Sequence, residues 1–128
     1  MIVFINGCFD VLHRGHIELF KYAKSLGDRL IIGIDSDKRV SELKGHLRPI
    51  NSEEDRKFFL ESIQYIDKVD IFSSEDQLRD LVWLYQPDIM VVGSDYKGKD
   101  VIGSEFAKNL IFIDRIGDYS TTNILERK

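Results

Sequence analysis

The sequence predicts an α/β fold, a doubly wound five-stranded parallel sheet with helices on both faces. Five short runs are rich in Ile and Val, and segments with helical periodicity lie between most of them. The runs are almost continuously apolar, as strands are when both faces of a parallel sheet are covered. These three observations predict a chain that alternates strand and helix from its beginning.

The predicted strands cover residues 2–5, 30–34, 69–72, 89–92 and 110–113. Doubly wound sheets bind ligands beyond the carboxyl ends of their strands, at the point where the strand order reverses. We therefore expect a site near Asn6 and Gly7, which follow the first predicted strand.

The first two helices are predicted from apolar spacing and caps. Apolar side chains recur at helical spacing over residues 17–26, and Gly27 closes this helix in the way a C-terminal glycine commonly does. After the second predicted strand, Ser36 has the character of an N-cap and predicts a short helix to about residue 43.

Three more helices are predicted from their first residues. Ser52 precedes an acid by three positions, which predicts a capped helix to about residue 63. Ser74, with a glutamine three positions later, opens a helix to residue 85. Near the end of the chain, Ser120-Thr121-Thr122 predicts the cap of a short helix.

Length and composition are those of an ordinary globular protein with one domain, residues 1–128. No apolar run approaches the roughly 20 residues that a membrane helix needs, and a net charge of −4 argues against nucleic acid as a partner. A single cysteine, Cys8, permits no internal disulfide, and no secretory leader precedes the first predicted strand. We therefore expect a cytoplasmic protein that binds neither nucleic acid nor membrane.

The turn between the first predicted strand and the first predicted helix, residues 6–16, is the most informative segment. It carries His13 and His16 where the N–H groups of a helix start favour anions. In an acidic chain, an anionic ligand must be held by a few local cations. The turn therefore predicts a phosphate site, in which the helix dipole lowers the pKa of the imidazoles and a bound polyphosphate raises it.

Two other interpretations of this turn are weaker. Cys8 and Arg14 have the Cys-x5-Arg spacing of thiolate phosphatases, but the loop between them lacks small residues, and Asp10 within it would repel a phosphate. His13 and His16 have the spacing of a metal pair, but no third ligand is evident and the metal stays unknown.

A second loop, residues 93–100, nearly spells a phosphate-binding P-loop after a strand. The motif needs Ser or Thr after its lysine, and this chain has Asp100 there. The sequence therefore favours an ordinary polar loop.

His13-Arg14-Gly15-His16 resembles the H-x-G-H signature of a nucleotidyltransferase superfamily, and residues 7–13 are similar to the opening of its cytidylyltransferase-like branch. Ser120-Thr121-Thr122 matches that family's second phosphate-binding element. The resemblance implies a Rossmann-like fold and transfer of a nucleoside monophosphate from a nucleoside triphosphate (NTP) to a phosphorylated sugar or polyol, with release of pyrophosphate. Magnesium would be carried with the triphosphate.

The resemblance also implies roles for individual residues. Those implied to be catalytic are His13, His16, Lys44 and Arg115. Those implied to bind the nucleotide are Gly7, Cys8, Phe9, Gly15, Gly93, Asp95, Ser120 and Thr121. Those implied to bind the acceptor are Asp10, Lys44, Arg56 and Lys97.

The substrates are less closely defined. Residues 43–49, 93–97 and 120–124 resemble heptose 1-phosphate adenylyltransferases, which use ATP. Residues 55–61 and Arg115 resemble glycerol-3-phosphate cytidylyltransferases, which use CTP. Three segments against two favour the first, and the second stays as the alternative.

Two hypotheses from other classes also stay open: a Cys8-dependent phosphatase and a non-catalytic nucleotide-binding module. Members of the resembled family are commonly homodimers, so we expect a homodimer. Four aromatic side chains leave room for an interface, unless they belong to the core: Phe58, Phe59, Tyr65 and Trp83.

Overall fold

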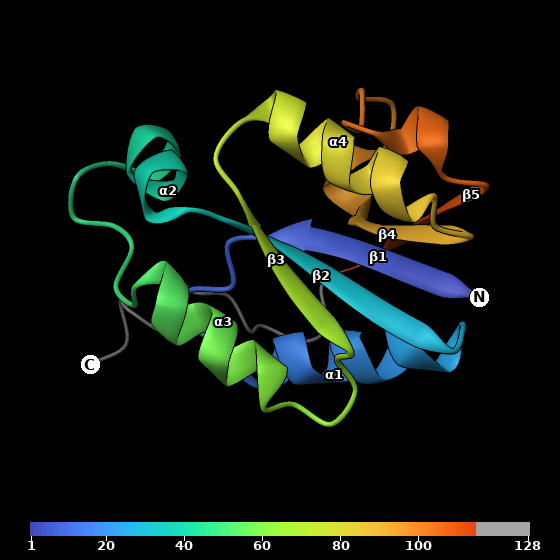
Figure 1. Ribbon diagram of the computed structural model, residues 1–128, viewed down its shortest axis with the longest axis horizontal. Coiled ribbons are helices and arrows are strands. Elements are labelled where there is room, and N and C mark those ends of the chain that lie inside the picture. Colours follow the sequence, from blue (N-terminus) through green and yellow to red (C-terminus); the bar gives the residue numbers. More distant parts are fainter. Residues whose placement is uncertain (115–128) are drawn as a thin grey trace.

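The computed structural model describes residues 1–114, and for Asp95 its backbone alone. Five parallel strands form one sheet in the order β3-β2-β1-β4-β5 (Figure 1). The strands are β1 (Ile2–Gly7), β2 (Arg29–Asp35), β3 (Lys68–Phe72), β4 (Ile89–Gly93) and β5 (Asn109–Ile113). Each contains a predicted run and is one or two residues longer, which confirms the five-stranded parallel sheet.

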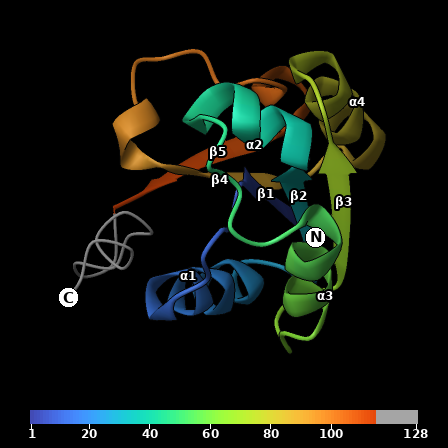
Figure 2. The same ribbon diagram turned by 90° about the vertical axis from the view of Figure 1, so that its left-hand side faces the viewer.

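The helices cover both faces of the sheet. They are α1 (Arg14–Ser25), α2 (Asp37–Lys44), α3 (Glu53–Glu61) and α4 (Glu75–Tyr85), with 3-10 turns at η1 (Ser94–Tyr96) and η2 (Ser104–Phe106). Figure 2 shows α1 and α3 on one side of the strands and α2 and α4 on the other. The doubly wound, Rossmann-like architecture is thereby confirmed. The C-terminal helix predicted at residues 120–122 lies outside the described residues.

Alternate residues of β1 supply the two cores. Val3 and Ile5 face one side and pack with Phe20 and Ala23 of α1, whereas Phe4 faces the other and belongs to the cluster that includes α4. This is the period of two that places successive strand side chains on opposite faces. A strand covered on both faces has no polar side to show, which explains why the predicted runs are almost continuously apolar.

The carboxyl half of β1 marks the point where the strand order reverses. The ladder with β2 continues to the pair Gly7 and Ile34, whereas the ladder with β4 pairs Val3 with Ile89 and Phe4 with Met90. Beyond Phe4 the two strands separate, and a crevice opens at the carboxyl edge of the sheet. This is where doubly wound folds place their ligands.

Helix α1 differs from its prediction at both ends. It begins three residues earlier, because His13 caps it before the apolar periodicity starts. It ends at Ser25, and Gly27 does not take the left-handed conformation that a C-terminal glycine commonly has. A Cβ on Gly27 would lie 2.7 Å from the carbonyl oxygen of Met1, so a close backbone approach explains this glycine.

The four aromatic side chains left open by the sequence divide into two groups. Phe58, Phe59 and Trp83 are exposed, whereas Tyr65 packs against the core. The exposed rings lie on α3 and α4, on opposite faces of the sheet (Figure 2). The homodimer stays a prediction.

Within residues 1–114, no helix combines the length and the apolar character that crossing a membrane requires.

Gly103→Ala should lower the free energy of unfolding by about 2–5 kcal/mol. Gly103 has a φ of +84°, and a Cβ there would lie 2.7 Å from Cγ2 of the fully buried Val82, so left-handed strain and overpacking add. Gly98 is a matched control, because its φ is +79° and a Cβ there meets nothing within 4 Å. Urea titration should give about 1–2 kcal/mol for Gly98→Ala. Equal losses in the two variants would refute the packing argument.

Candidate active site

A cavity of about 1060 Å³ lies along the carboxyl edge of the sheet. All five strand ends contribute to its lining, through Asn6, Asp35, Phe72, Gly93 and Ile113. It therefore spans the crevice at the end of β1 and continues over β2 and β3 on one side and over β4 and β5 on the other.

Two histidines at the start of α1 face this cavity. His13 is the N-cap, and its Nδ1 accepts the backbone N–H of Gly15 at 3.1 Å. His16 Nδ1 accepts the backbone N–H of His13 at 3.2 Å, and the two rings stack with centroids 3.8 Å apart. Two imidazoles thus replace the Ser or Thr and the Glu or Gln of an ordinary capping box.

The capping bonds fix the tautomer of both rings. Each Nδ1 accepts a hydrogen bond from a backbone N–H, so each imidazole, when neutral, carries its own proton on Nε2. A neutral His13 and a neutral His16 therefore both act as Nε2–H donors. This arrangement suits an anion at the start of a helix, where backbone N–H groups add to the attraction.

Burial, with smaller contributions from the neighbouring His13 and Lys44, lowers the pKa of His16 to about 4. The ring packs edge-on against Phe9 at 5.4 Å and lies 6.5 Å from Phe20. His16 is therefore neutral at physiological pH in the unliganded protein.

The loop after β1 presents its backbone to the cavity. Phe9 has a positive φ of 52° and folds its ring back against Gly7, where a Cβ would lie 3.0 Å from the ring. Gly7, Cys8, Phe9 and Gly15 all line the cavity. The absent Cβ of Gly7 is thus what allows the aromatic ring to close under His16.

Cys8 and Arg14 do not form the cradle of a thiolate phosphatase. Burial raises the pKa of the Cys8 thiol, outweighing the opposing effects of Lys44 and Arg56, so the thiol stays protonated at neutral pH. Arg14 is exposed, pairs with Glu18 at 3.7 Å and does not line the cavity.

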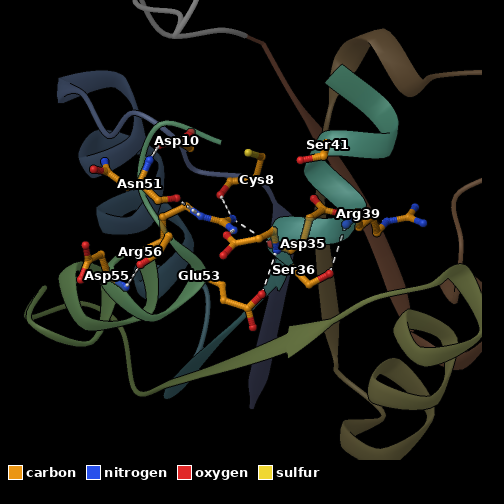
Figure 3. Close-up of polar contacts among 12 residues, drawn as sticks. Cys8, Asp10, Asp35, Ser36, Arg39, Ser41, Asn51, Glu53, Asp55 and Arg56 are labelled. Carbon is orange, nitrogen blue, oxygen red and sulfur yellow. Dashed lines mark hydrogen bonds and ion pairs between the residues drawn. The ribbon is translucent and has the colours of Figure 1, made fainter. Parts of the chain in front are cut away.

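Arg56 is fully buried and holds three chain segments together (Figure 3). Its Nη1 donates to the carbonyl oxygens of Cys8 at 2.9 Å and Asp35 at 2.8 Å, and its Nε donates to that of Asn51 at 3.1 Å. Its Nη2 pairs with the carboxylate of Asp37 at 2.9 Å. The expectation that Arg56 contacts the acceptor is corrected, because every guanidinium nitrogen is already bonded within the protein.

Asp10 needs the same correction. Its side chain is fully buried, and its carboxylate accepts the backbone N–H groups of Ile50 at 2.5 Å and Asn51 at 2.9 Å. Arg48 donates to its carbonyl oxygen at 2.9 Å. Asp10 thus fastens the loop before α3 to the loop after β1 and does not line the cavity.

The remaining predicted residues have different outcomes. Lys44, the last residue of α2, and Gly93, the last of β4, both line the cavity. Lys97 is exposed, lies over the ring of Phe112 at 6.0 Å and does not line it.

Four of the predicted roles rest on groups that the structure does not describe. The side chain of Asp95 lies outside the described groups. Arg115, Ser120 and Thr121 lie beyond residue 114, so their roles stay predictions. No three His, Cys, Asp or Glu side chains within the described part of the chain are grouped to hold a metal ion.

The sequence-based reasoning missed several lining residues, among them Asp35, Arg39 and Arg48. Asp35 follows a predicted strand directly, and the rule that ligands bind beyond strand ends would have pointed to it. Arg39 and Arg48 carried no such signal, because a charged residue in a helix or loop is ordinarily solvated.

A parallel sheet with a cavity at its reversal point, lined by an H-x-G-H turn, defines a nucleotidyltransferase. A family model described as cytidylyltransferase-like matches residues 4–127, and the chain belongs to this family. The family assignment and the enzyme class predicted from the sequence are confirmed.

Several relatives share the name bifunctional protein HldE. The chain is 51% identical over 126 residues to that of a Nitratiruptor species, and 48% identical to that of Helicobacter pylori strain Shi470. Each alignment covers 98% of this chain and 27% of the relative, so the chain spans about a quarter of their length.

A solved structure supports the same fold. The lipopolysaccharide core biosynthesis protein from Thermoplasma volcanium GSS1 superposes with a TM-score of 0.69 at 26% identity, covering 94% of this chain and 98% of that one.

Arg56→Met should lower the free energy of unfolding by about 3–5 kcal/mol, because three carbonyl oxygens around the buried side chain lose their shared donor. Arg79→Met is the control. Arg79 is half-exposed and pairs with Asp76 at 3.5 Å and Glu105 at 3.3 Å, and surface pairs of this kind contribute about 0–1 kcal/mol. Urea titration measures the loss of stability in each variant. Similar losses in the two variants would contradict the bridging role of Arg56.

The stability of the protein should fall as the pH is lowered from about 6.5 to about 4. In this window the unfolded chain protonates His16 and the folded protein does not, so the folded state loses up to about 3 kcal/mol. His16→Gln removes the titrating ring but keeps an acceptor at the third helical position for the N–H of His13. Urea titrations across this window should give a shallower slope for the variant, and an unchanged slope would contradict the assignment.

Proposed function

We propose that this protein transfers a nucleoside monophosphate from an NTP to a phosphorylated sugar, as a heptose 1-phosphate adenylyltransferase does. The observation that carries the proposal is the imidazole pair of His13 and His16, held by its capping bonds at the start of α1 and facing the cavity. The relatives named HldE and the resemblance of residues 43–49 and 93–97 support the adenylyltransferase form. The glycerol-3-phosphate cytidylyltransferase form, with CTP, is the alternative.

In the proposed reaction, an oxygen of the acceptor phosphate attacks the α-phosphorus of the NTP. A new P–O bond forms, the bond from the α-phosphorus to the bridging oxygen breaks, and pyrophosphate leaves with that oxygen. A phosphate monoester has a second pKa of about 6 and is largely ionised at neutral pH, so the protein needs no strong base. Catalysis then consists of positioning and charge stabilisation.

The groups that face the cavity are suited to this task. The Nε2–H groups of His13 and His16 are donors for phosphate oxygens, and the first N–H groups of α1 add the field of the helix. Lys44 brings a full positive charge from the end of α2. Gly15, between the histidines, carries no side chain and lets a phosphate approach the backbone.

We propose that magnesium enters with the triphosphate. The described residues offer no cluster of three metal-ligating side chains, and phosphate oxygens commonly supply most of the ligands that magnesium keeps in such sites. The metal would neutralise part of the triphosphate charge. We also propose a cytoplasmic homodimer for the active protein.

A matrix of substrates tests the proposal. ATP and CTP are each combined with heptose 1-phosphate and with glycerol 3-phosphate, and pyrophosphate release is measured. We expect the greatest release from ATP with heptose 1-phosphate, and none from an NTP without an acceptor. If no pair releases pyrophosphate, the proposed function is wrong.

The imidazole pair can be tested apart from its capping role. His16→Gln keeps a capping acceptor, so its melting temperature should stay within a few degrees of that of the wild-type protein. Its kcat/KM should fall by about a hundredfold or more, because the amide lacks the Nε2–H of the imidazole ring and cannot take up a proton as charge develops on the phosphate. Cys8→Ser is the control. It would abolish any activity that depends on the Cys8 thiolate, whereas we expect it to retain most of the transfer activity. Full activity in His16→Gln would remove the imidazole from the mechanism.

A further inference from the structure

The cavity extends past the imidazole pair to the ends of β2 and β3, where a second set of polar groups lines it. Asp35 ends β2, Arg39 lies one helical turn further on in α2, and Phe72 ends β3. No role for Asp35 or Arg39 follows from the chemistry of the transferred phosphate. They lie across β1 from β4 and β5.

The two charged side chains are held in place. Arg39 Nε donates to Asp35 Oδ1 at 2.7 Å, and the guanidinium carbon of Arg39 lies 5.6 Å from the centre of the Phe72 ring. The side chains of Arg39 and Asp35 are 18% and 13% exposed, so the pair is largely withdrawn from solvent but reachable from the cavity. Figure 3 shows Asp35 between Arg39 and Arg56, whose Nη1 holds its carbonyl oxygen.

The pair has hydrogen-bonding capacity that the protein does not use. A guanidinium has five N–H donors, and the Nη groups of Arg39 make no hydrogen bond to any residue that the structure describes. The carboxylate of Asp35 accepts from Arg39 and has further lone pairs. Donors and acceptors therefore stand side by side at the cavity wall.

This combination selects a class of ligand. A phosphate at the pair would be attracted by Arg39 and repelled by Asp35, and an apolar group would leave both charges without water or a partner. Hydroxyl groups donate to a carboxylate and accept from a guanidinium, so neighbouring hydroxyls of a polyol satisfy both. Phe72 and Leu78 also line the cavity, but they are almost fully buried and offer little surface to a ligand.

We propose that Asp35 and Arg39 bind the hydroxyl groups of the acceptor and thereby select a polyhydroxylated phosphate. This inference rests on the proposed function. It assigns the triphosphate to the imidazole pair at the start of α1, and the carbon chain of the acceptor to the β2 and β3 side of the cavity. The two residues determine specificity and take no part in the bond that forms.

Kinetics of Arg39→Met and Asp35→Asn test this assignment against two acceptors, heptose 1-phosphate and a plain alkyl monophosphate. The KM for heptose 1-phosphate should rise about tenfold or more, while the KM for ATP and the kcat stay within about twofold. The kcat/KM for the alkyl phosphate should change little, since it has no hydroxyls to lose. Lys38→Met is the matched control, because Lys38 precedes Arg39 in α2 and is exposed; it should match the wild-type protein.

Other outcomes would overturn the inference. An equal loss with both acceptors would make Arg39 a phosphate contact, and a raised KM for ATP would place the ribose at the pair. Arg39→Gln keeps a donor beside Asp35 and replaces Arg39→Met if that variant does not fold. Its KM for heptose 1-phosphate should rise less than that expected for Arg39→Met.

The inference and the proposed function fail in distinguishable ways. Absence of pyrophosphate release by the wild-type protein contradicts the proposed function alone. In that case calorimetric titration of the wild-type protein and Arg39→Met with the two phosphates decides the inference. The inference is supported if the wild-type protein binds heptose 1-phosphate more tightly than the alkyl phosphate and Arg39→Met does not. It is overturned if both proteins bind the two phosphates equally.

Discussion

The buried guanidinium of Arg56 is the constraint on which the geometry of the cavity depends. It bonds to the backbone after β1, to the last residue of β2, to the start of α2 and to the residues before α3. A fully buried cation is costly unless its donors are satisfied, and here each nitrogen has at least one partner. The cation therefore helps to fix the relative positions of the loop after β1, the junction of β2 and α2, and the loop before α3.

Neighbouring contacts extend this control to both halves of the site. The Asp10 carboxylate holds the backbone of Ile50 and Asn51, and the Asp37 backbone donates to Glu53 at 2.9 Å, which ties the start of α2 to that of α3. The loop that leads to His13 and the strand end that carries Asp35 are thus set by one polar network. A change of Arg56 or of Asp10 would therefore alter the proposed triphosphate and acceptor contacts together, even though neither residue lines the cavity.

The sequence predicted the sheet well and the polar network poorly, for a physical reason. The strands are easy to recognise in the sequence because burial on both faces excludes polar residues. The position of the cavity follows from the order of the strands in the sheet. Charge can be read from a sequence, but burial cannot. Arg56 and Asp10 were therefore predicted to touch the acceptor, whereas the structure uses them within the protein. The i, i+4 pair of Asp35 and Arg39 has the spacing of an ordinary surface pair. Only its position in the lining of the cavity indicates a role in binding.

The choice of histidine as a capping residue links stability to the proposed chemistry. A serine and a glutamine would cap α1 equally well and could still donate a hydrogen bond, but neither can take up a proton near neutral pH. Histidine has two separate nitrogens, so one caps the helix and the other faces the ligand. Burial keeps His16 neutral before binding, which avoids placing another charge beside Lys44. In the proposed reaction negative charge grows on the departing pyrophosphate, and this growth raises the proton affinity of the ring. The interaction between ring and phosphate then strengthens as the bond breaks, which is the differential binding that catalysis requires.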